Sequence, residues 1–224
     1  MNFRFSWLLP VIAMGWLVGC ASLDEADDSD DVPSREKSKP TPRPTTVAYI
    51  SVAQQMMEVV RDGVRIARYP VSTSKYGLGD DPNSYKTPLG IFEIAKKIGE
   101  GVPRGGKFYK RKFTGVVFDL DHYDPILHPA EYDSILTRIL WLNGLEWRNR
   151  RAYNRGIYIH GTNQEHLVGR PVSYGCIRMK NNDVLKLFEL LDEGAYVVIR
   201  QAPLPNGPSY QDLIALTQRA NTSG

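Results

Sequence analysis

The fold is decided by two stretches of this chain, Gly156-Ile157-Tyr158-Ile159-His160-Gly161-Thr162 and Ser173-Tyr174-Gly175-Cys176-Ile177-Arg178-Met179. The first is an apolar run that ends on a histidine, a pattern typical of a buried strand with a polar residue at its end. The second has a glycine directly before a cysteine, which permits a tight turn and favours a loop. Together they predict a strand that delivers His160 to a loop that presents Cys176.

Strand patterns extend outward from these two stretches. Asp62-Gly63 separates the runs Met56–Val60 and Val64–Ala67, which is a strong signal for a two-residue hairpin. The residues Thr87-Pro88-Leu89-Gly90 form a predicted turn that leads into a strand at Ile91–Ile94. Three further strand-like runs are Val116–Phe118, Ile135–Leu142 (where a helix is the alternative) and Tyr196–Ile199.

One helix is expected among these strands, at Asn182–Leu191, with an asparagine as its N-cap and Gly194 just past its end. Its apolar face consists of Val184, Leu185, Phe188 and Leu191. Many short strands with one or two short helices predict a mainly β domain of the sandwich or barrel-like kind. We place this domain at residues 47–201.

The first 20 residues have the features of a bacterial export signal. Arg4 precedes an apolar stretch, Trp7–Val18, that is too short to span a bilayer. The stretch closes with Leu17-Val18-Gly19-Cys20, which resembles the bacterial lipobox, so Cys20 is expected to be lipid-modified and to become the mature N-terminus. The alternative is a plain secretory signal with an accidental cysteine. Ala21 after the cysteine resembles an outer-membrane sorting signal of Gram-negative bacteria.

Two flanking segments lack the pattern of a core. Residues 21–46 combine an acidic block with a proline-rich stretch, which predicts a disordered tether between the anchor and the domain. Residues 202–224 contain three prolines and a weak helical pattern, so we expect a C-terminal tail that carries a short helix at most.

The composition is ordinary for a globular domain, and the formal net charge of the 224 residues is only +3. So mild a charge does not favour nucleic acid, and we expect no such partner. Two basic clusters favour solvated loops over contacts with carboxylates: Arg104, Lys107, Lys110, Arg111 and Lys112, and then Arg148, Arg150, Arg151 and Arg155. A group of possible metal ligands lacks zinc or calcium spacing, so neither metal nor cofactor is expected: Asp119, Asp121, His122 and Asp124.

Each of the two cysteines, Cys20 and Cys176, lies in a motif of its own. A disulfide between them is the simple expectation for a secreted protein, but lipid modification would consume Cys20. Cys176 is then either an inert buried thiol or a nucleophile, and only the thiolate form attacks. His160 could form an ion pair with that thiolate or accept its proton, and backbone N–H groups near Gly175 could stabilise an oxyanion.

The pair of stretches resembles the signature of the L,D-transpeptidase catalytic domain, the YkuD-like family. Weaker matches spread the resemblance over residues 47–201: Val71–Thr73, Thr87–Gly90, Thr137–Glu146 and Asn182–Val184. The resemblance implies that Cys176 is the nucleophile and that His160 is the general base, oriented by the carbonyl of Gly161. It further implies a frame around the oxyanion site and substrate pocket, made by Ser173, Tyr174, Gly175 and Arg178. Tyr174 departs from the family pattern, which usually has histidine there.

The implied function is acyl transfer on peptidoglycan. A thioester forms between the cysteine and a tetrapeptide stem, D-alanine leaves, and an amine receives the acyl group. The amine belongs to another stem, giving a 3→3 cross-link, or to an envelope lipoprotein. The alternatives are an L,D-carboxypeptidase or amidase with the same site, and a non-catalytic wall-binding lipoprotein. We expect a lipid-anchored protein of the cell envelope, at the outer membrane and facing the periplasm of a Gram-negative bacterium, with a lid at 121–155 that excludes water.

Overall fold

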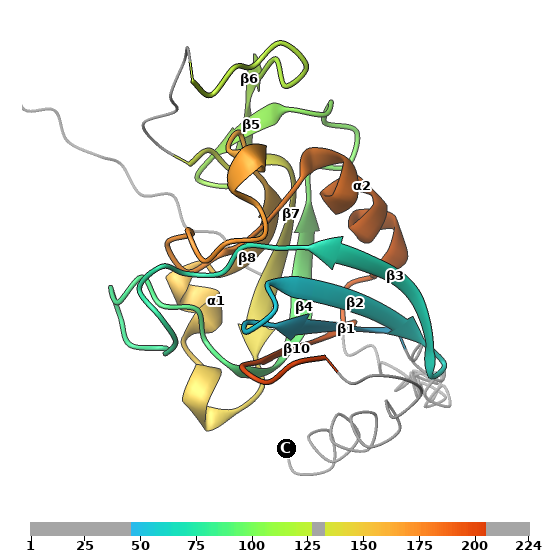
Figure 1. Ribbon diagram of the computed structural model, residues 1–224, viewed down its shortest axis with the longest axis vertical. Helices are drawn as coiled ribbons and strands as arrows, with labels where there is room; N and C mark the ends of the chain where they lie inside the picture. The colour runs from blue at the N-terminus through green and yellow to red at the C-terminus, as the bar shows by residue number, and fades with distance from the viewer. Residues whose placement is uncertain (1–45, 127–132, 205–224) are drawn as a thin grey trace, which may run out of the picture. The chain divides into compact units, whose positions relative to one another are not determined.

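The computed structural model describes residues 46–126 and 133–204 (Figure 1). Within these ranges the strands form one ten-stranded mixed sheet in the order β3-β2-β1-β10-β4-β7-β5-β6, and β8 pairs with both β7 and β9. The strands are β1 (Thr46–Ser51), β2 (Met56–Arg61), β3 (Val64–Pro70), β4 (Gly90–Ile98), β5 (Gly106–Tyr109), β6 (Lys112–Val117), β7 (Leu136–Gly144), β8 (Tyr158–Gly161), β9 (Ile177–Met179) and β10 (Tyr196–Arg200). The helical elements are η1 (Trp147–Asn149), α1 (Ala152–Arg155), η2 (Glu165–Leu167) and α2 (Asn181–Leu190). The mainly β fold class is confirmed.

The predicted hairpin is present as β2 and β3. Asp62 and Gly63 both have positive φ, 51° and 81°, as a tight hairpin of this length requires. Glycine adopts this backbone conformation without strain, and aspartate tolerates it better than most residues do. Local turn chemistry therefore sets the register next to the turn, where Arg61 faces Val64, and an irregularity between Val59 and Val60 shifts the register by one residue before Met57 faces Tyr69.

Strand β1 lies inside the sheet and is buried along its whole length, between β2, which is antiparallel to it, and β10, which is parallel. Alternate side chains point to opposite faces of a strand. Ala48 and Ile50 belong to the main core, whereas Val47 and Tyr49 belong to a smaller cluster that Leu204 completes. Both faces are thus covered, and each fully buried aliphatic side chain contributes about 1.5–3 kcal/mol to stability.

Strand β7 lies at the centre of the sheet, beside the strand β8 that carries His160. It pairs with β4 on one side and with β8 on the other, and its Leu136, Ile139 and Leu140 are fully buried. This confirms the strand interpretation of Ile135–Leu142. The same burial shows that the expected lid at 121–155 is wrong for the residues of β7, because a central strand cannot swing away from the sheet.

Helix α2 packs on β7 and β8, and it begins one residue earlier than expected (Figure 1). The asparagine cap was a wrong prediction: Lys180 is the N-cap, without a side-chain cap, and Asn181 is the first helical residue. Glu165 replaces the cap from outside the helix, since its Oε1 accepts from the backbone N–H of Asn181 at 2.6 Å. Gly194 does not end the helix either, because the C-cap is Leu191 in extended conformation.

Several expectations fall outside the described residues: the signal segment with Cys20, the tether up to residue 45 and the tail beyond residue 204. None of the helices in 46–126 and 133–204 has the length and apolarity that a membrane-crossing helix needs.

Candidate active site

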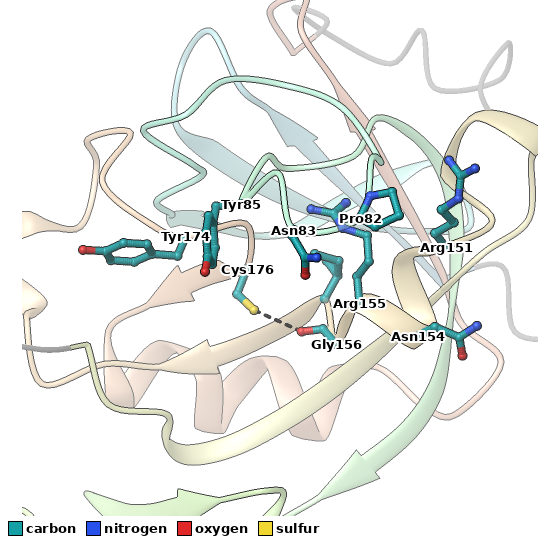
Figure 2. Close-up of a pocket in the computed structure, with 10 residues that line it drawn as sticks. Pro82, Asn83, Tyr85, Arg151, Asn154, Arg155, Gly156, Tyr174 and Cys176 are labelled. Carbon is teal, nitrogen blue, oxygen red and sulfur yellow. Dashed lines mark hydrogen bonds between the residues drawn. The ribbon is translucent and has the colours of Figure 1, made fainter.

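Strands β8 and β9 bring the histidine and the cysteine together. They pair in parallel with His160 beside Arg178, so Cys176, just before β9, lies next to Tyr158 at the start of β8. The backbone N–H of Tyr158 donates to Cys176 Sγ at 3.4 Å, and the thiol donates to Gly156 O at 3.3 Å (Figure 2). Cys176 is partly buried and is a free thiol.

The loop before Cys176 is held by its own polar groups. Ser173 Oγ donates to Cys176 O at 2.6 Å and accepts from the Gly175 N–H at 3.2 Å. Thr87 Oγ1 donates to Gly175 O at 3.0 Å, which ties this loop to the turn before β4. Of the backbone N–H groups near Gly175 that were expected to be free for an oxyanion, the N–H of Gly175 itself is not free, because it donates to Ser173 Oγ.

Gly175 has a φ of 117°, a conformation that favours glycine. A Cβ there would lie 3.2 Å from Lys86 O and 3.4 Å from Tyr85 O. The absence of a side chain therefore serves two purposes: it permits the turn that presents Cys176, and it lets the backbone at 85–86 approach the turn closely.

His160 is 1% exposed, and its orientation is fixed by the next residue. Its Nδ1 lies 2.8 Å from Gly161 O, so Nδ1 carries the proton and Nε2 has the free lone pair. Burial lowers the pKa of His160. The charge of Asp133 and the Gly161 carbonyl raise this pKa, but their effects are smaller. A Cβ on Gly161 would collide with Asn181, so this glycine is needed for packing.

Asp133 is a site residue that the sequence did not reveal. Its Oδ2 lies 2.7 Å from Arg178 Nε and 3.9 Å from His160 Nε2, and its Oδ1 accepts from Thr162 Oγ1 at 2.6 Å. Arg178 is 1% exposed and also donates to Gln164 Oε1 at 2.9 Å. Arg178 therefore acts on the site through Asp133, since its buried guanidinium is occupied by protein partners.

Burial favours the neutral forms of both the thiol and the imidazole. It raises the pKa of Cys176 to about 11, and the Tyr158 N–H lowers it only in part. Burial also lowers the pKa of His160, so the surroundings of both groups disfavour a thiolate–imidazolium pair. Of the two expectations for His160, the geometry favours proton acceptance during the reaction over a preformed ion pair.

Two cavities border Cys176 in the described part of the chain. One, of about 310 Å³, is lined by Asp133, Ile135, His160, Tyr174 and Cys176. The other, of about 540 Å³, lies toward α1 and the loop at 82–85, and its polar lining includes Asn83, Arg151 and Asn154. In Figure 2, Tyr85 and Tyr174 lie on one side of Cys176, and Arg151 and Asn154 lie on the other. The sulfur is thus approachable from two directions.

The remaining predicted site residues differ in exposure. Tyr174 is half-exposed and borders both cavities, whereas Ser173 is fully buried and borders neither of them. Within the basic clusters, Arg155 is not a solvated residue: its guanidinium donates to Asp80 Oδ1 at 2.8 Å and to Lys86 O at 2.7 Å. Arg155 therefore holds the loop at 80–86 in place.

Fold and site define the chain as a mainly β domain with a cysteine and a histidine at one cavity. The chain belongs to the L,D-transpeptidase catalytic domain family, whose model (YkuD) matches residues 45–199. YqjB of Bacillus subtilis (strain 168), provisionally named an L,D-transpeptidase, is 54% identical over 41 residues, which are 18% of this chain and 23% of YqjB. YcfS of Escherichia coli (strain K12), provisionally named likewise, is 39% identical over 64 residues, or 26% of this chain and 20% of YcfS. Each match thus spans less than a quarter of the relative.

Solved structures of L,D-transpeptidases also resemble this chain, but their sequence identity to it is low. An L,D-transpeptidase from Mycobacterium smegmatis is 16% identical with a TM-score of 0.45, over 70% of this chain and 59% of that one. An L,D-transpeptidase from Xylanimonas cellulosilytica DSM 15894 is 18% identical with a TM-score of 0.45, over 72% of this chain and 64% of that one. Because both TM-scores are low, the family assignment rests on the match to the family model.

Proposed function

We propose that this protein is a peptidoglycan L,D-transpeptidase with Cys176 as its nucleophile and His160 as its general base. The observation that carries the proposal is the cavity of about 310 Å³ that both residues line, together with the larger cavity on the other side of Cys176. A binding module has no need of a thiol and an imidazole at one cavity, whereas acyl transfer requires both.

Activation of the thiol follows from the hydrogen bonds of the site. His160 keeps its proton on Nδ1 against Gly161 O, so Nε2 is the atom that receives the proton of Cys176. The resulting imidazolium has its Nε2 3.9 Å from the carboxylate of Asp133, and this carboxylate stabilises the positive charge on His160. The Tyr158 N–H, 3.4 Å from Sγ, stabilises the negative charge on sulfur in the same step.

The acyl transfer then has two steps. Sγ attacks the carbonyl carbon of the third stem residue, the C–S bond forms, the amide C–N bond breaks, and D-alanine leaves with the proton from His160. In the second step an acceptor amine attacks the thioester, the new amide bond forms as the C–S bond breaks, and the amine proton returns to Sγ through His160. The two cavities offer the donor and the acceptor separate approaches to the sulfur.

The larger cavity fits an extended peptide that carries carboxylates. Asn83 and Asn154 supply amide groups that both donate and accept, as a peptide backbone requires. Arg151 supplies a guanidinium for a carboxylate, while its backbone N–H is held by Asp80 Oδ2 at 2.7 Å. We therefore assign the donor stem to this cavity and the acceptor to the smaller one.

The experiment that tests the function uses the full chain with a purified disaccharide-tetrapeptide muropeptide, followed by mass spectrometry. The expected products are an acyl-enzyme that has lost D-alanine and a cross-linked dimer, and Cys176→Ala yields neither of them. If tripeptide forms without dimer, the assigned activity would change from transpeptidase to L,D-carboxypeptidase. If the folded protein forms no acyl-enzyme, dimer or tripeptide, the result would support the alternative of a non-catalytic wall-binding lipoprotein.

Location in the envelope is a second part of the proposal, and it is supported by the lipobox-like segment that ends at Cys20. Lipid chains on Cys20 would anchor the domain at the outer membrane, facing the periplasm, and residues 21–45 would span the distance to the wall. Replacement of Cys20 by alanine should move the protein from the membrane fraction to the soluble fraction. Cys176→Ala is the matched control and should stay with the membrane, and an unchanged distribution of Cys20→Ala would contradict the anchor.

A further inference from the structure

Next to the nucleophile, the described residues include a cluster of three solvent-exposed tyrosines, which we call the tyrosine platform: Tyr76, Tyr85 and Tyr174. Their exposed fractions are 46%, 56% and 49%. The ring centroids of Tyr76 lie 5.8 Å from Tyr85 and 5.7 Å from Tyr174, and those of Tyr85 and Tyr174 are 6.1 Å apart. A single exposed aromatic ring needs no explanation, but a contiguous exposed group beside an active site indicates a binding surface.

The backbone that presents Tyr85 is strained and tightly held. Tyr85 has a φ of 57°, which is uncommon for a residue with a bulky side chain. Its carbonyl accepts from Ser74 Oγ at 2.5 Å, and Arg155 holds the next carbonyl, that of Lys86, at 2.7 Å. Such strain persists only where surrounding contacts enforce it, and it is concentrated at functional sites. The exposed ring of Tyr85 is therefore held in position by buried partners.

Lys75 distinguishes the three rings from one another. Its Nζ lies 4.5 Å from the ring centroid of Tyr174 and donates to the Tyr174 hydroxyl at 3.2 Å. Arg178 Cζ is also 5.9 Å from that ring, so Tyr174 is supported by two cations. No cation–π contact is present at Tyr85 among the described residues, and Tyr76 has one, with Lys75 at 5.2 Å. Tyr174 therefore supports the platform, while Tyr85 and Tyr76 present it to solvent.

The chemistry of the platform suits a pyranose ring. A sugar has apolar C–H faces that stack on aromatic rings, and its hydroxyl and acetamido groups need donors and acceptors at the edge. The edge groups are present: the phenol hydroxyls, the Lys75 ammonium and the amide of Asn83, two residues before Tyr85. Tyrosine also supplies a large rigid contact area at a small cost in side-chain entropy.

The position of the platform also agrees with the donor substrate. A stem peptide is joined at its N-terminal end to an N-acetylated amino sugar, and three extended residues span about 10 Å. Tyr174 is two residues from Cys176, so its Cα lies within about 7 Å of the nucleophile's Cα, and its side chain extends the reach. A donor with its third residue at Cys176 would therefore bring its sugar within reach of these rings.

We propose that the tyrosine platform is a saccharide subsite that binds the N-acetylated sugar from which the donor stem peptide extends. The proposal rests on the proposed transpeptidase function and adds to it a preference for stems that are still attached to glycan. Tyr85 and Tyr76 stack on the sugar, and Tyr174 with Lys75 keeps their arrangement.

The test compares kcat/KM of the full chain for a disaccharide-tetrapeptide and for the free tetrapeptide. We expect a ratio of about three- to ten-fold in favour of the disaccharide form, mostly through KM, since contact between the sugar and the rings stabilises the bound substrate and the transition state alike. Tyr76→Ala should bring the ratio close to one. Tyr109→Ala is the matched control, because Tyr109 is an exposed tyrosine on β5 outside the platform, and it should retain the wild-type ratio.

A binding measurement makes the inference independent of turnover. N,N′-diacetylchitobiose, titrated into the full chain and followed by NMR, should shift tyrosine ring signals in wild type and in Tyr109→Ala, and its binding should be lost in Tyr76→Ala. A wild-type ratio near one, or a ratio and binding that survive in both Tyr76→Ala and Tyr85→Ala, would overturn the subsite. Inactivity on both substrates with intact chitobiose binding would contradict the proposed function instead.

Discussion

The two sides of Cys176 differ in almost every physical respect. Toward the smaller cavity, His160 and Arg178 are each 1% exposed, and hydrogen bonds or an ion pair fix their orientation. Toward the loop at 82–85, Tyr85 is 56% exposed and Asn83 lines an open cavity. The buried side shifts pKa values and positions a proton acceptor, while the exposed side offers contact area and polar groups to a ligand. The residues that perform the chemistry and those that recognise the substrate thus lie on different sides of Cys176.

The comparison predicts that the largest loss comes from the buried side. His160→Ala should reduce the rate of acylation of Cys176 by a carbapenem by about 100- to 10,000-fold, the range for loss of a general base. Stopped-flow fluorescence or time-resolved mass spectrometry measures this rate. A loss below about ten-fold would remove His160 from its role as the base.

Asp133→Asn tests the support of His160 and should act on both stability and rate. The substitution leaves the buried guanidinium of Arg178 without its carboxylate, which typically costs about 3 kcal/mol of unfolding free energy. It also removes the charge 3.9 Å from His160 Nε2, so the pKa of His160 should fall further and the acidic limb of the rate profile should move to lower pH.

The matched control for Asp133→Asn is Asp121→Asn. Asp121 pairs with Arg104 at 2.9 Å on the exposed surface, where solvent screens the pair, so its loss should have little effect on stability and leave the rate profile unchanged. Urea unfolding and the pH dependence of acylation measure both effects. Equal destabilisation by the two variants would mean that the buried pair is no more important than a surface one.

Changes at Tyr174, which is half-exposed and borders both cavities, should have small effects. Tyr174→Phe removes the hydroxyl that accepts from Lys75, which is a single solvent-exposed hydrogen bond, and should slow acylation at most about ten-fold. Tyr174→His, which restores the residue usual in the family, should change the rate little. If Tyr174→Phe is as slow as His160→Ala, the separation of chemistry from recognition is wrong.

The last predicted effect is on stability and appears only at alkaline pH. Because burial raises the pKa of Cys176 from 9.0 to about 11, the unfolded chain releases this proton before the folded chain does. The contribution is fully present below about pH 9 and is lost as the pH rises toward about 11. The thermal unfolding temperature (Tm) of the wild type should therefore fall more steeply with pH over this window than the Tm of Cys176→Ala. Parallel pH curves for the two proteins would contradict a buried neutral thiol.

Much of the fold follows from local patterns in the sequence. The hairpin at Asp62-Gly63 and the strand at Ile91–Ile94 were predicted because turn chemistry and apolar runs act over a few residues. The start of α2 was missed by one residue because Glu165, from a different segment, accepts from the backbone N–H of its first residue, Asn181. The lid expected at 121–155 is wrong for its β7 part, which is buried by pairing with β4 and β8, and composition alone does not show this pairing.

The sequence by itself determined that a histidine at the end of a strand and a Gly-Cys turn belong to one family's motif, because both signals are short and contiguous. Only the tertiary structure decided what surrounds them. Asp133 comes from a loop without any pattern, and it reaches His160 and Arg178 only because β8 and β9 pair in parallel. Tyr76 and Tyr85 come from the segment between β3 and β4, and Tyr174 comes from the loop before β9, so tertiary contacts place the three rings about 6 Å apart. Contacts between distant segments depend on strand register and loop approach, which no local pattern encodes.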